Sequence, residues 1–126
     1  MEVSIFKKVL YGIAPEVGAS LGKVISPEVI PNFLACQIET RKFSLYILCS
    51  ENNDWAFVED YDPESCELIF INNELISSKL KDIYNIKTLT KEELNLPFKA
   101  TNSMLESDIK YWRPKTMGEG LFNWWD

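Results

Sequence analysis

Apolar residues recur at helical spacing over the first part of the chain. Residues 3–13 place five of them on one face of a helix: Val3, Phe6, Val9, Leu10 and Ile13. This spacing of three and four residues predicts a first helix that ends near Gly12. The same period resumes after Pro15 and continues through residues 17–25, which predicts that the helix restarts there. Two prolines within residues 26–31 then predict a loop.

From residue 33 the apolar pattern becomes that of β-strands. Four segments rich in β-branched and aromatic residues are joined by short polar connections: residues 34–39, 43–49, 55–58 and 66–71. Strands that follow one another through such short connections predict an antiparallel meander. Residues 43–49 are nearly continuous in apolar side chains, which predicts a central strand that is covered on both faces.

Helix-start signals dominate the last third of the chain. Asn73 can cap a helix that runs to about Tyr84, with an apolar stripe of Ile76, Leu80, Ile83 and Tyr84. Three capping boxes predict further helices: Thr90 with Glu93, Ser103 with Glu106, and Thr116 with Glu119. The second of these helices is expected to turn four apolar residues toward the core: Met104, Leu105, Ile109 and Trp112. We therefore predict an α+β fold in one domain, residues 1–126, in which about four antiparallel strands in a meander pack against N-terminal and C-terminal helices.

The C-terminal segment is unusually aromatic. Met117, Leu121 and Trp125 fall on one helical stripe, and Phe122 and Trp124 widen it. A packed aromatic ring buries about 150–250 Å². We therefore expect this end of the chain to be docked into the core, unlike most termini.

Two glycines lie within the first turn of this last helix, where each costs roughly 0.5–1 kcal/mol relative to alanine. The favoured interpretation is that another part of the backbone passes too close to Gly118 and Gly120 to leave room for a Cβ atom. The alternative is an anion site at the helix N-terminus beside Arg113 and Lys115. No phosphate-loop spacing accompanies the glycines, so the first interpretation is preferred.

Composition and charge restrict the class of protein. The chain has 126 residues, of which 46% are hydrophobic and 25% charged, as in an ordinary soluble domain. No apolar run approaches the roughly 20 residues of a membrane span, and no signal-peptide pattern occurs at residues 1–8, so a cytoplasmic protein is expected. The net charge of −6 argues against direct binding of nucleic acid and favours a basic partner.

The sequence offers little for catalysis. It contains no histidine, which removes serine–histidine chemistry and the commonest metal ligand. Cys36, Cys49 and Cys66 form no CxxC pair, lie among apolar or strand-like neighbours, and are expected to be free and inert. Zinc binding is poorly supported by their spacing. We predict that the protein is not an enzyme and binds no cofactor or metal.

Six acidic residues lie in the two connections that flank the predicted strand at residues 55–58: Glu51, Asp54, Glu59, Asp60, Asp62 and Glu64. Two aromatic residues, Trp55 and Tyr61, lie among them. One interpretation is that these are solvated turns, because aspartate and asparagine favour turn geometry. A second is a carboxylate pair for glycoside hydrolysis, although a chain this short seldom provides the cleft. The third is a protein-binding face for a basic surface, with the two aromatic rings as anchors.

A calcium loop is not supported by this region. Residues 60–64 alternate acidic side chains, but the run lacks the glycine and the final glutamate that such loops require. Pro63 also interrupts it.

The end of the chain carries a resemblance to a known class of protein. Residues 113–126 have the sequence RPKTMGEGLFNWWD, which resembles the ending of small bacterial immunity proteins of contact-dependent growth inhibition and related polymorphic-toxin systems. The resemblance implies a chain that binds one cognate toxin domain in a 1:1 heterodimer and covers its active or substrate-binding surface. The acidic charge would suit a basic toxin such as a nuclease. The alternative is a non-catalytic adaptor or housekeeping interaction domain without a toxin partner.

Overall fold

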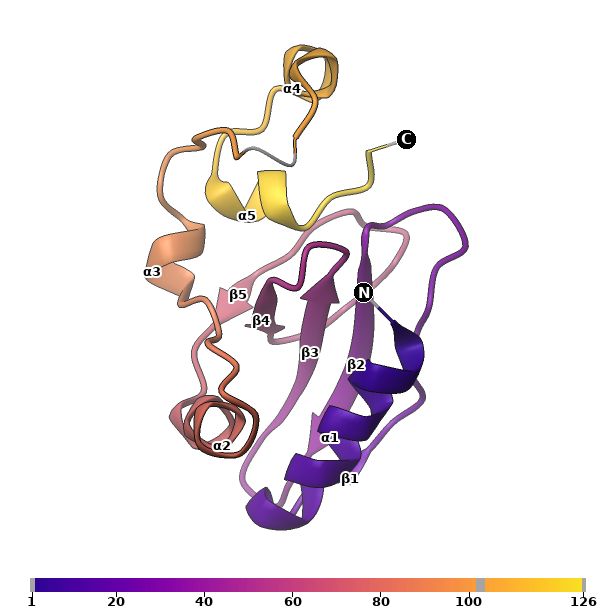
Figure 1. The fold of residues 1–126 in the computed structure, drawn as a ribbon, viewed down its shortest axis with the longest axis vertical. Helices are drawn as coiled ribbons and strands as arrows, with labels where there is room; N and C mark the ends of the chain where they lie inside the picture. The colour runs from indigo at the N-terminus through magenta and orange to yellow at the C-terminus, as the bar shows by residue number, and fades with distance from the viewer. Residues whose placement is uncertain (1, 102–103, 126) are drawn as a thin grey trace.

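The computed structural model of the chain describes residues 2–101 and 104–125. Its middle layer is one antiparallel sheet whose strands follow one another in chain order (Figure 1). The strands are β1 (Ser20–Leu21), β2 (Phe33–Glu39), β3 (Ser44–Ser50), β4 (Trp55–Val58) and β5 (Phe70–Ile71). With helices before and after the sheet, the predicted α+β class is confirmed. The described residues form five strands where about four were predicted.

The three longest strands form the predicted meander. β3 lies between β2 and β4. In its pairing with β2, Ile47 is opposite Cys36. Successive side chains of a strand point to opposite faces of the sheet. Ile47 accordingly lies in one hydrophobic cluster, while Leu48 lies in the other. The prediction that residues 43–49 form a central strand covered on both faces is confirmed.

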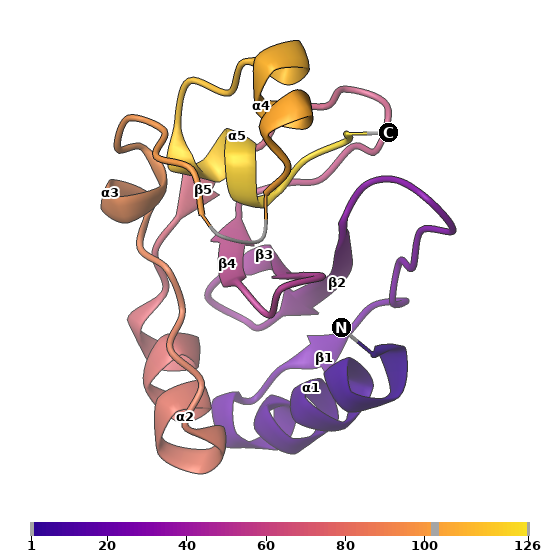
Figure 2. The same cartoon turned by 45° about the horizontal axis from the view of Figure 1, so that its top comes forward.

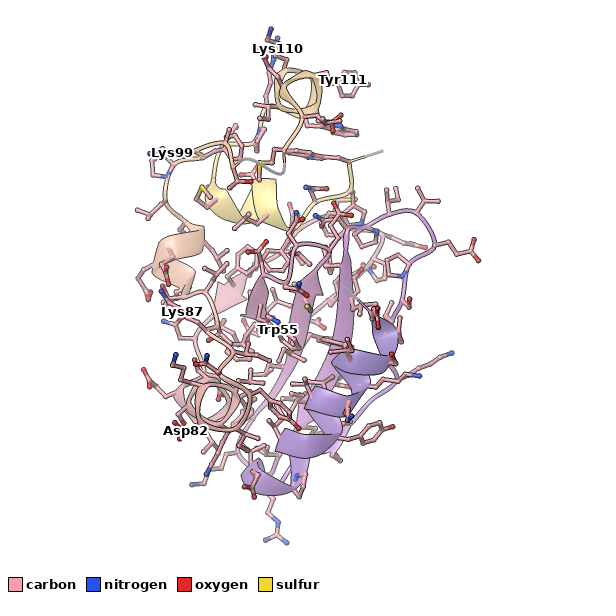
Figure 3. All side chains as sticks on the ribbon, in the orientation of Figure 1. Trp55, Asp82, Lys87, Lys99, Lys110 and Tyr111 are labelled. Atoms are coloured by element: carbon pink, nitrogen blue, oxygen red, sulfur yellow. The ribbon has the colours of Figure 1, made fainter. Side chains whose placement is uncertain are left out.

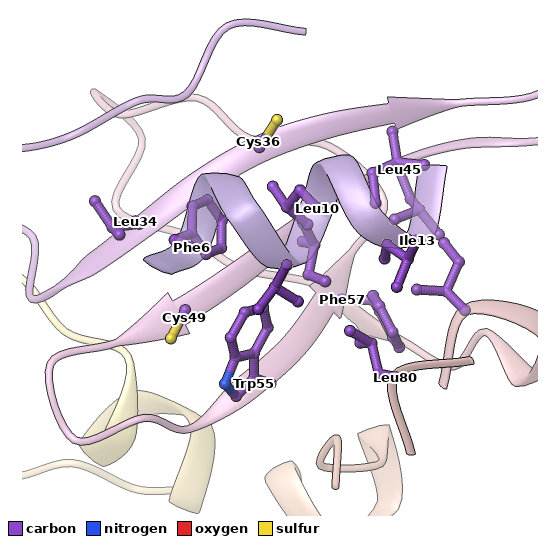
Figure 4. Packing of buried hydrophobic residues seen from close by; sticks show 14 residues of the cluster. Phe6, Leu10, Ile13, Leu34, Cys36, Leu45, Cys49, Trp55, Phe57 and Leu80 are labelled. Atoms are coloured by element: carbon purple, nitrogen blue, oxygen red, sulfur yellow. The ribbon is translucent and has the colours of Figure 1, made fainter. Parts of the chain in front are cut away.

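Two helices cover one face of the sheet (Figure 4): α1 (Val3–Val17) and α2 (Glu74–Tyr84). From α1, Phe6, Leu10 and Ile13 pack against the strands, and from α2, Ile76 and Leu80 join them. All five side chains are buried. Each such burial contributes about 1.5–3 kcal/mol relative to an exposed side chain. This layer is therefore an ordinary helix–sheet core.

Segments that follow β4, apart from α2, cover the opposite face (Figure 2). The segments involved are α3 (Lys91–Leu94), α5 (Met117–Leu121), the loop at residues 59–69 and the tail at residues 122–125. Leu94 and Phe122 are buried there against Phe33 of β2 and its neighbours. The helix α4 (Glu106–Trp112) lies outside this layer, and none of its residues is buried.

The N-terminal helix is longer than predicted. It passes Gly12, includes Pro15 in its last turn and ends at Val17, with Gly18 as its C-cap. Pro15 removes one backbone donor, but its fixed φ is compatible with a helix, so a last turn can still form. Gly18 has φ 66°, a left-handed conformation that favours glycine and ends helices.

The predicted helical restart over residues 17–25 is wrong. This segment contains β1, in which Leu21 pairs with Ile38 of β2, and its Ile25 forms a further antiparallel bridge to Ala35. Backbone pairing with the edge of β2 therefore outweighs a spacing that also fits a helix.

The strand predicted over residues 66–71 is reduced to its last two residues, which form β5. Cys66 has φ 55°, a left-handed conformation that a strand cannot contain. A turn precedes it, in which Ser65 N–H and its hydroxyl both donate to Asp62 O at 3.2 and 3.0 Å. Residues 59–69 therefore form a loop.

Most predicted helix caps are present. The Asn73 side chain accepts from Ile76 N–H at 3.0 Å at the start of α2, and Thr90 with Glu93 forms a complete capping box at α3. Ser103 lies outside the described residues. The expectation that the following helix turns an apolar stripe to the core is wrong, because Leu105 and Trp112 remain 66% and 39% exposed.

Candidate partner-binding site

The six predicted acidic residues fall into two groups at opposite ends of β4. Glu51 and Asp54 belong to the β3–β4 turn, whereas Glu59, Asp60, Asp62 and Glu64 belong to the loop after β4. A strand of four residues spans about 10–13 Å. The two groups are therefore apart in the structure, although they are close in the sequence. The group after β4 carries more of the negative charge.

The turn before β4 has a structural role for Asp54. Its carboxylate accepts from Ser50 Oγ at 2.9 Å, and its own N–H donates to the same oxygen at 3.0 Å. Burial raises the pKa of Asp54, and the Ser50 hydrogen bond partly opposes that rise. A half-buried carboxylate fixed in a turn is poorly placed for a partner. Glu51, in the same turn, is exposed.

Trp55 and Tyr61 are not surface anchors, contrary to the prediction. Trp55 is only 6% exposed and lies 5.5 Å from Phe6 between ring centroids, inside the helix–sheet core (Figure 4). Tyr61 is 7% exposed and packs edge-on against Phe33 at 5.6 Å. Burial is the main cause that raises the pKa of Tyr61 to about 12, and its neighbours Cys66 and Asp62 add to the rise. Both rings belong to the core clusters, and little of either ring is open to a partner.

The loop at residues 59–69, here called the acidic loop, keeps its carboxylates in solvent. Its four predicted site residues are all exposed: Glu59, Asp60, Asp62 and Glu64. Asp60 accepts from Tyr61 N–H at 2.9 Å and Asp62 from Glu64 N–H at 3.0 Å, as expected of turn residues. The one ion pair between described residues joins Lys110 and Glu106 of α4 at 3.2 Å, so no described cation pairs with this loop.

A pocket of about 400 Å³ opens beside the acidic loop. One wall comes from Cys66 and Leu68 of that loop, and another from Trp112, Pro114 and Glu119 around α5. Trp124 and Trp125 of the tail complete it. We call this the tryptophan pocket. The sequence alone does not indicate this pocket, because its walls come from segments that are far apart in the chain.

The tail that forms this pocket is held in place by Asn32. The Asn32 amide donates to Leu121 O at 3.0 Å and its Oδ1 accepts from Asn123 N–H at 2.8 Å. Phe122 is 2% exposed and contacts Phe33 edge-on at 5.9 Å. The C-terminal segment is therefore docked as predicted. The helix, however, ends at Leu121, so Trp125 lies beyond it and is half-buried.

The start of α5 follows only part of its predicted cap. Thr116 Oγ1 accepts from Glu119 N–H at 3.2 Å, but the Glu119 carboxylate accepts from the Thr116 hydroxyl at 3.3 Å. The Glu119 side chain is exposed at the pocket wall.

Trp124 Nε1 is buried without an acceptor among the described residues.

Close packing explains the two glycines of α5. A Cβ on Gly118 would collide with the ring of Phe70, and a Cβ on Gly120 with the ring of Phe98. The prediction that neighbours leave no room for a Cβ is confirmed, although those neighbours are aromatic side chains and not backbone.

The cysteines differ in exposure. Cys36 and Cys49 are buried, and burial raises the pKa of both thiols, that of Cys49 to about 12. All three are free, as expected, but Cys66 is exposed, so the burial that was the reason to expect an inert thiol is missing there. Within residues 2–101 and 104–125, no group of three or more Cys, Asp or Glu is arranged to hold a metal ion. In the same ranges, no helix has the length and apolar character needed to cross a membrane.

Comparison of the chain with protein-family models, with curated proteins and with solved structures gives no match.

Proposed function

We propose that this protein is an immunity protein, which binds a basic toxin domain and neutralises it by covering its active or substrate-binding surface. The observation that carries the proposal is the acidic loop. It presents Glu59, Asp60, Asp62 and Glu64 to solvent, and no cation of the described residues pairs with it. An unneutralised acidic surface attracts a basic partner and accelerates the encounter.

The C-terminal sequence supports the same proposal from another direction. Residues 113–126 resemble the ending of small bacterial immunity proteins. In this fold the run supplies Phe122 to the core and Trp124 to the pocket wall. Its similarity to that family therefore concerns residues that shape the second face of the molecule, beside the acidic loop.

Inhibition would proceed by occlusion without chemistry on the toxin. A nuclease must keep lysine and arginine side chains exposed to hold the phosphate backbone. Carboxylates of the acidic loop would pair with those cations and exclude the nucleic acid. The expected product is a 1:1 heterodimer that forms rapidly and lacks toxin activity.

The test is coexpression with the toxin domain encoded next to this chain. Light scattering of the purified mixture should give the mass of a 1:1 complex, and cells that carry both genes should grow where cells with the toxin alone stop. A non-cognate toxin domain of similar charge serves as the control for specificity. Absence of both the complex and the protection would contradict the proposal, and would favour an adaptor domain without a toxin partner.

A further inference from the structure

We infer that the tryptophan pocket receives a lysine or arginine side chain of the partner. The inference rests on the proposed function, since it takes the basic toxin as the source of that side chain. It adds a specific recognition site, built on the C-terminal tail, to the diffuse attraction of the acidic loop.

The lining of the pocket matches the chemistry of a cation. Trp112, Trp124 and Trp125 all contribute to it. The face of an indole ring is the strongest of the aromatic binding surfaces for ammonium and guanidinium groups. With about 400 Å³, the pocket falls in the range of 300–1,000 Å³ that holds small ligands, so one long side chain fits.

Charge in and around the pocket favours a positive occupant. Among the described lining residues, Glu119 is the only one with a carboxylate side chain, and no described cation pairs with it. Cys66 and Leu68 bring the acidic loop to the pocket edge, with Glu64 and Glu67 close by in the chain. Arg113 and Lys115 flank Pro114 in the sequence and oppose this field, but neither lines the pocket.

Access from solvent is also present. Trp112 is 39% exposed, and the helix in which it lies, α4, has no buried residues. Its ring contacts Tyr111, which is 76% exposed, at 5.0 Å between centroids. Figure 3 shows Tyr111 projecting from α4 at the edge of the molecule. Trp112 therefore contributes little to the core and is available to a partner.

A small probe tests the pocket without the toxin. The protein is labelled with ¹⁵N in its four tryptophans and titrated with N-acetyl-arginine amide, and each indole N–H signal is assigned by a Trp→Phe replacement. The signals of Trp112 and Trp125 should shift and saturate. The signal of Trp55, which is buried on the other face of the sheet, should stay in place.

The matched neutral probe is N-acetyl-citrulline amide, which has nearly the same shape and no charge. It should shift the same signals much less. Glu119→Gln and Trp112→Ala should each weaken the arginine probe roughly two- to fivefold, the factor expected from a cation–π or charge contact at an exposed site. Equal shifts with both probes, or no shift at Trp112 and Trp125, would overturn the inference.

Toxin binding then separates this inference from the proposed function. Trp112→Ala and Glu119→Gln should speed dissociation of the complex. Tyr11→Ala, at an exposed ring of α1, and Glu74→Gln serve as controls far from the pocket. If wild type binds the toxin and the two pocket variants dissociate at the wild-type rate, the pocket is not the recognition site and the immunity function stands. If the wild-type protein binds no toxin, the proposed function is contradicted, and a toxin can then not be the source of the side chain in the pocket.

Discussion

The three thiols differ in the access that solvent has to them. Only the thiolate is a nucleophile, and with a pKa of about 12 the Cys49 thiol is almost entirely protonated at pH 8. We expect iodoacetamide to modify Cys66 rapidly and to leave Cys36 and Cys49 unmodified until the protein unfolds. Peptide mass spectrometry over time would measure this order. Modification of Cys49 at the rate of Cys66 would show that β3 is not buried, and Cys66→Ser should remove the fast reaction.

Trp55 and Trp112 allow a direct comparison of a buried and an exposed ring. Trp55→Ala should reduce the free energy of unfolding by about 3–5 kcal/mol, because the ring fills the space between α1 and the sheet. Trp112→Ala should change it by less than about 0.5 kcal/mol, as expected for a surface site. Urea denaturation followed by circular dichroism measures both. Similar losses for the two variants would contradict the assignment of one ring to the core and the other to the surface.

For single residues, the sequence shows the chemistry of each side chain but does not always show whether that side chain is buried. Trp55 and Tyr61 lie among acidic residues, and this local setting suggests a surface. Their burial depends on Phe6 and Phe33, which are distant in the sequence. Local pattern contains no information about such contacts. The acidic side chains beside them needed no distant partner to be exposed, so the prediction that they face solvent agrees with the structure for the acidic loop.

At the scale of elements, α5 depends on the absence of two side chains. Gly118→Ala places a Cβ atom against the ring of Phe70. The gain in helix propensity is roughly 0.5–1 kcal/mol, whereas overpacking of this kind costs about 1–3 kcal/mol. We expect net destabilisation in urea denaturation. Phe70→Leu in the same chain should restore part of the loss, and a double mutant without any such coupling would contradict the proposed contact.

The elements that the sequence predicted well are those with local causes. Asn73 and Thr90 cap helices through hydrogen bonds to residues three positions away, so their signals are complete in the sequence. Residues 17–25 show the opposite case. Their apolar spacing fits a helix, but the backbone of β2 offers hydrogen bonds to Ile25 and to its neighbours. Whether residues 17–25 form a strand therefore depends on β2, which lies later in the chain.

At the scale of the whole molecule, the two faces of the sheet have different coverings. α1 and α2 close the first face with regular helices (Figure 4), and the second is closed by loops, short helices and the aromatic tail. Loops on a rigid scaffold carry binding residues more often than the regular elements that they connect. The acidic loop and the tryptophan pocket share this second face, through Cys66 and Leu68. A partner that docks there would meet both charge and aromatic surface without disturbing the helix–sheet core.

The exposed carboxylates of the acidic loop lead to a prediction about the rate of association. Asp60→Asn, Asp62→Asn and Glu64→Gln together should slow association with a basic toxin domain at low salt, while dissociation changes less, because steering acts on the encounter. Asparagine and glutamine retain side-chain acceptors, so the turns at Asp60 and Asp62 can still form. Stopped-flow measurements of the association rate against salt concentration would test this, with circular dichroism as the folding control.

The matched control removes the same formal charge elsewhere. Glu16→Gln, Glu74→Gln and Asp82→Asn change three exposed carboxylates of α1 and α2, behind the opposite face of the sheet. If the acidic loop steers the toxin, this control should keep most of the wild-type association rate, and the two rates should converge as salt screens the field over about 8–10 Å. Equal slowing by both triple variants would mean that only net charge matters and would remove the acidic loop as the binding face. An association rate that does not depend on salt would contradict a basic partner altogether.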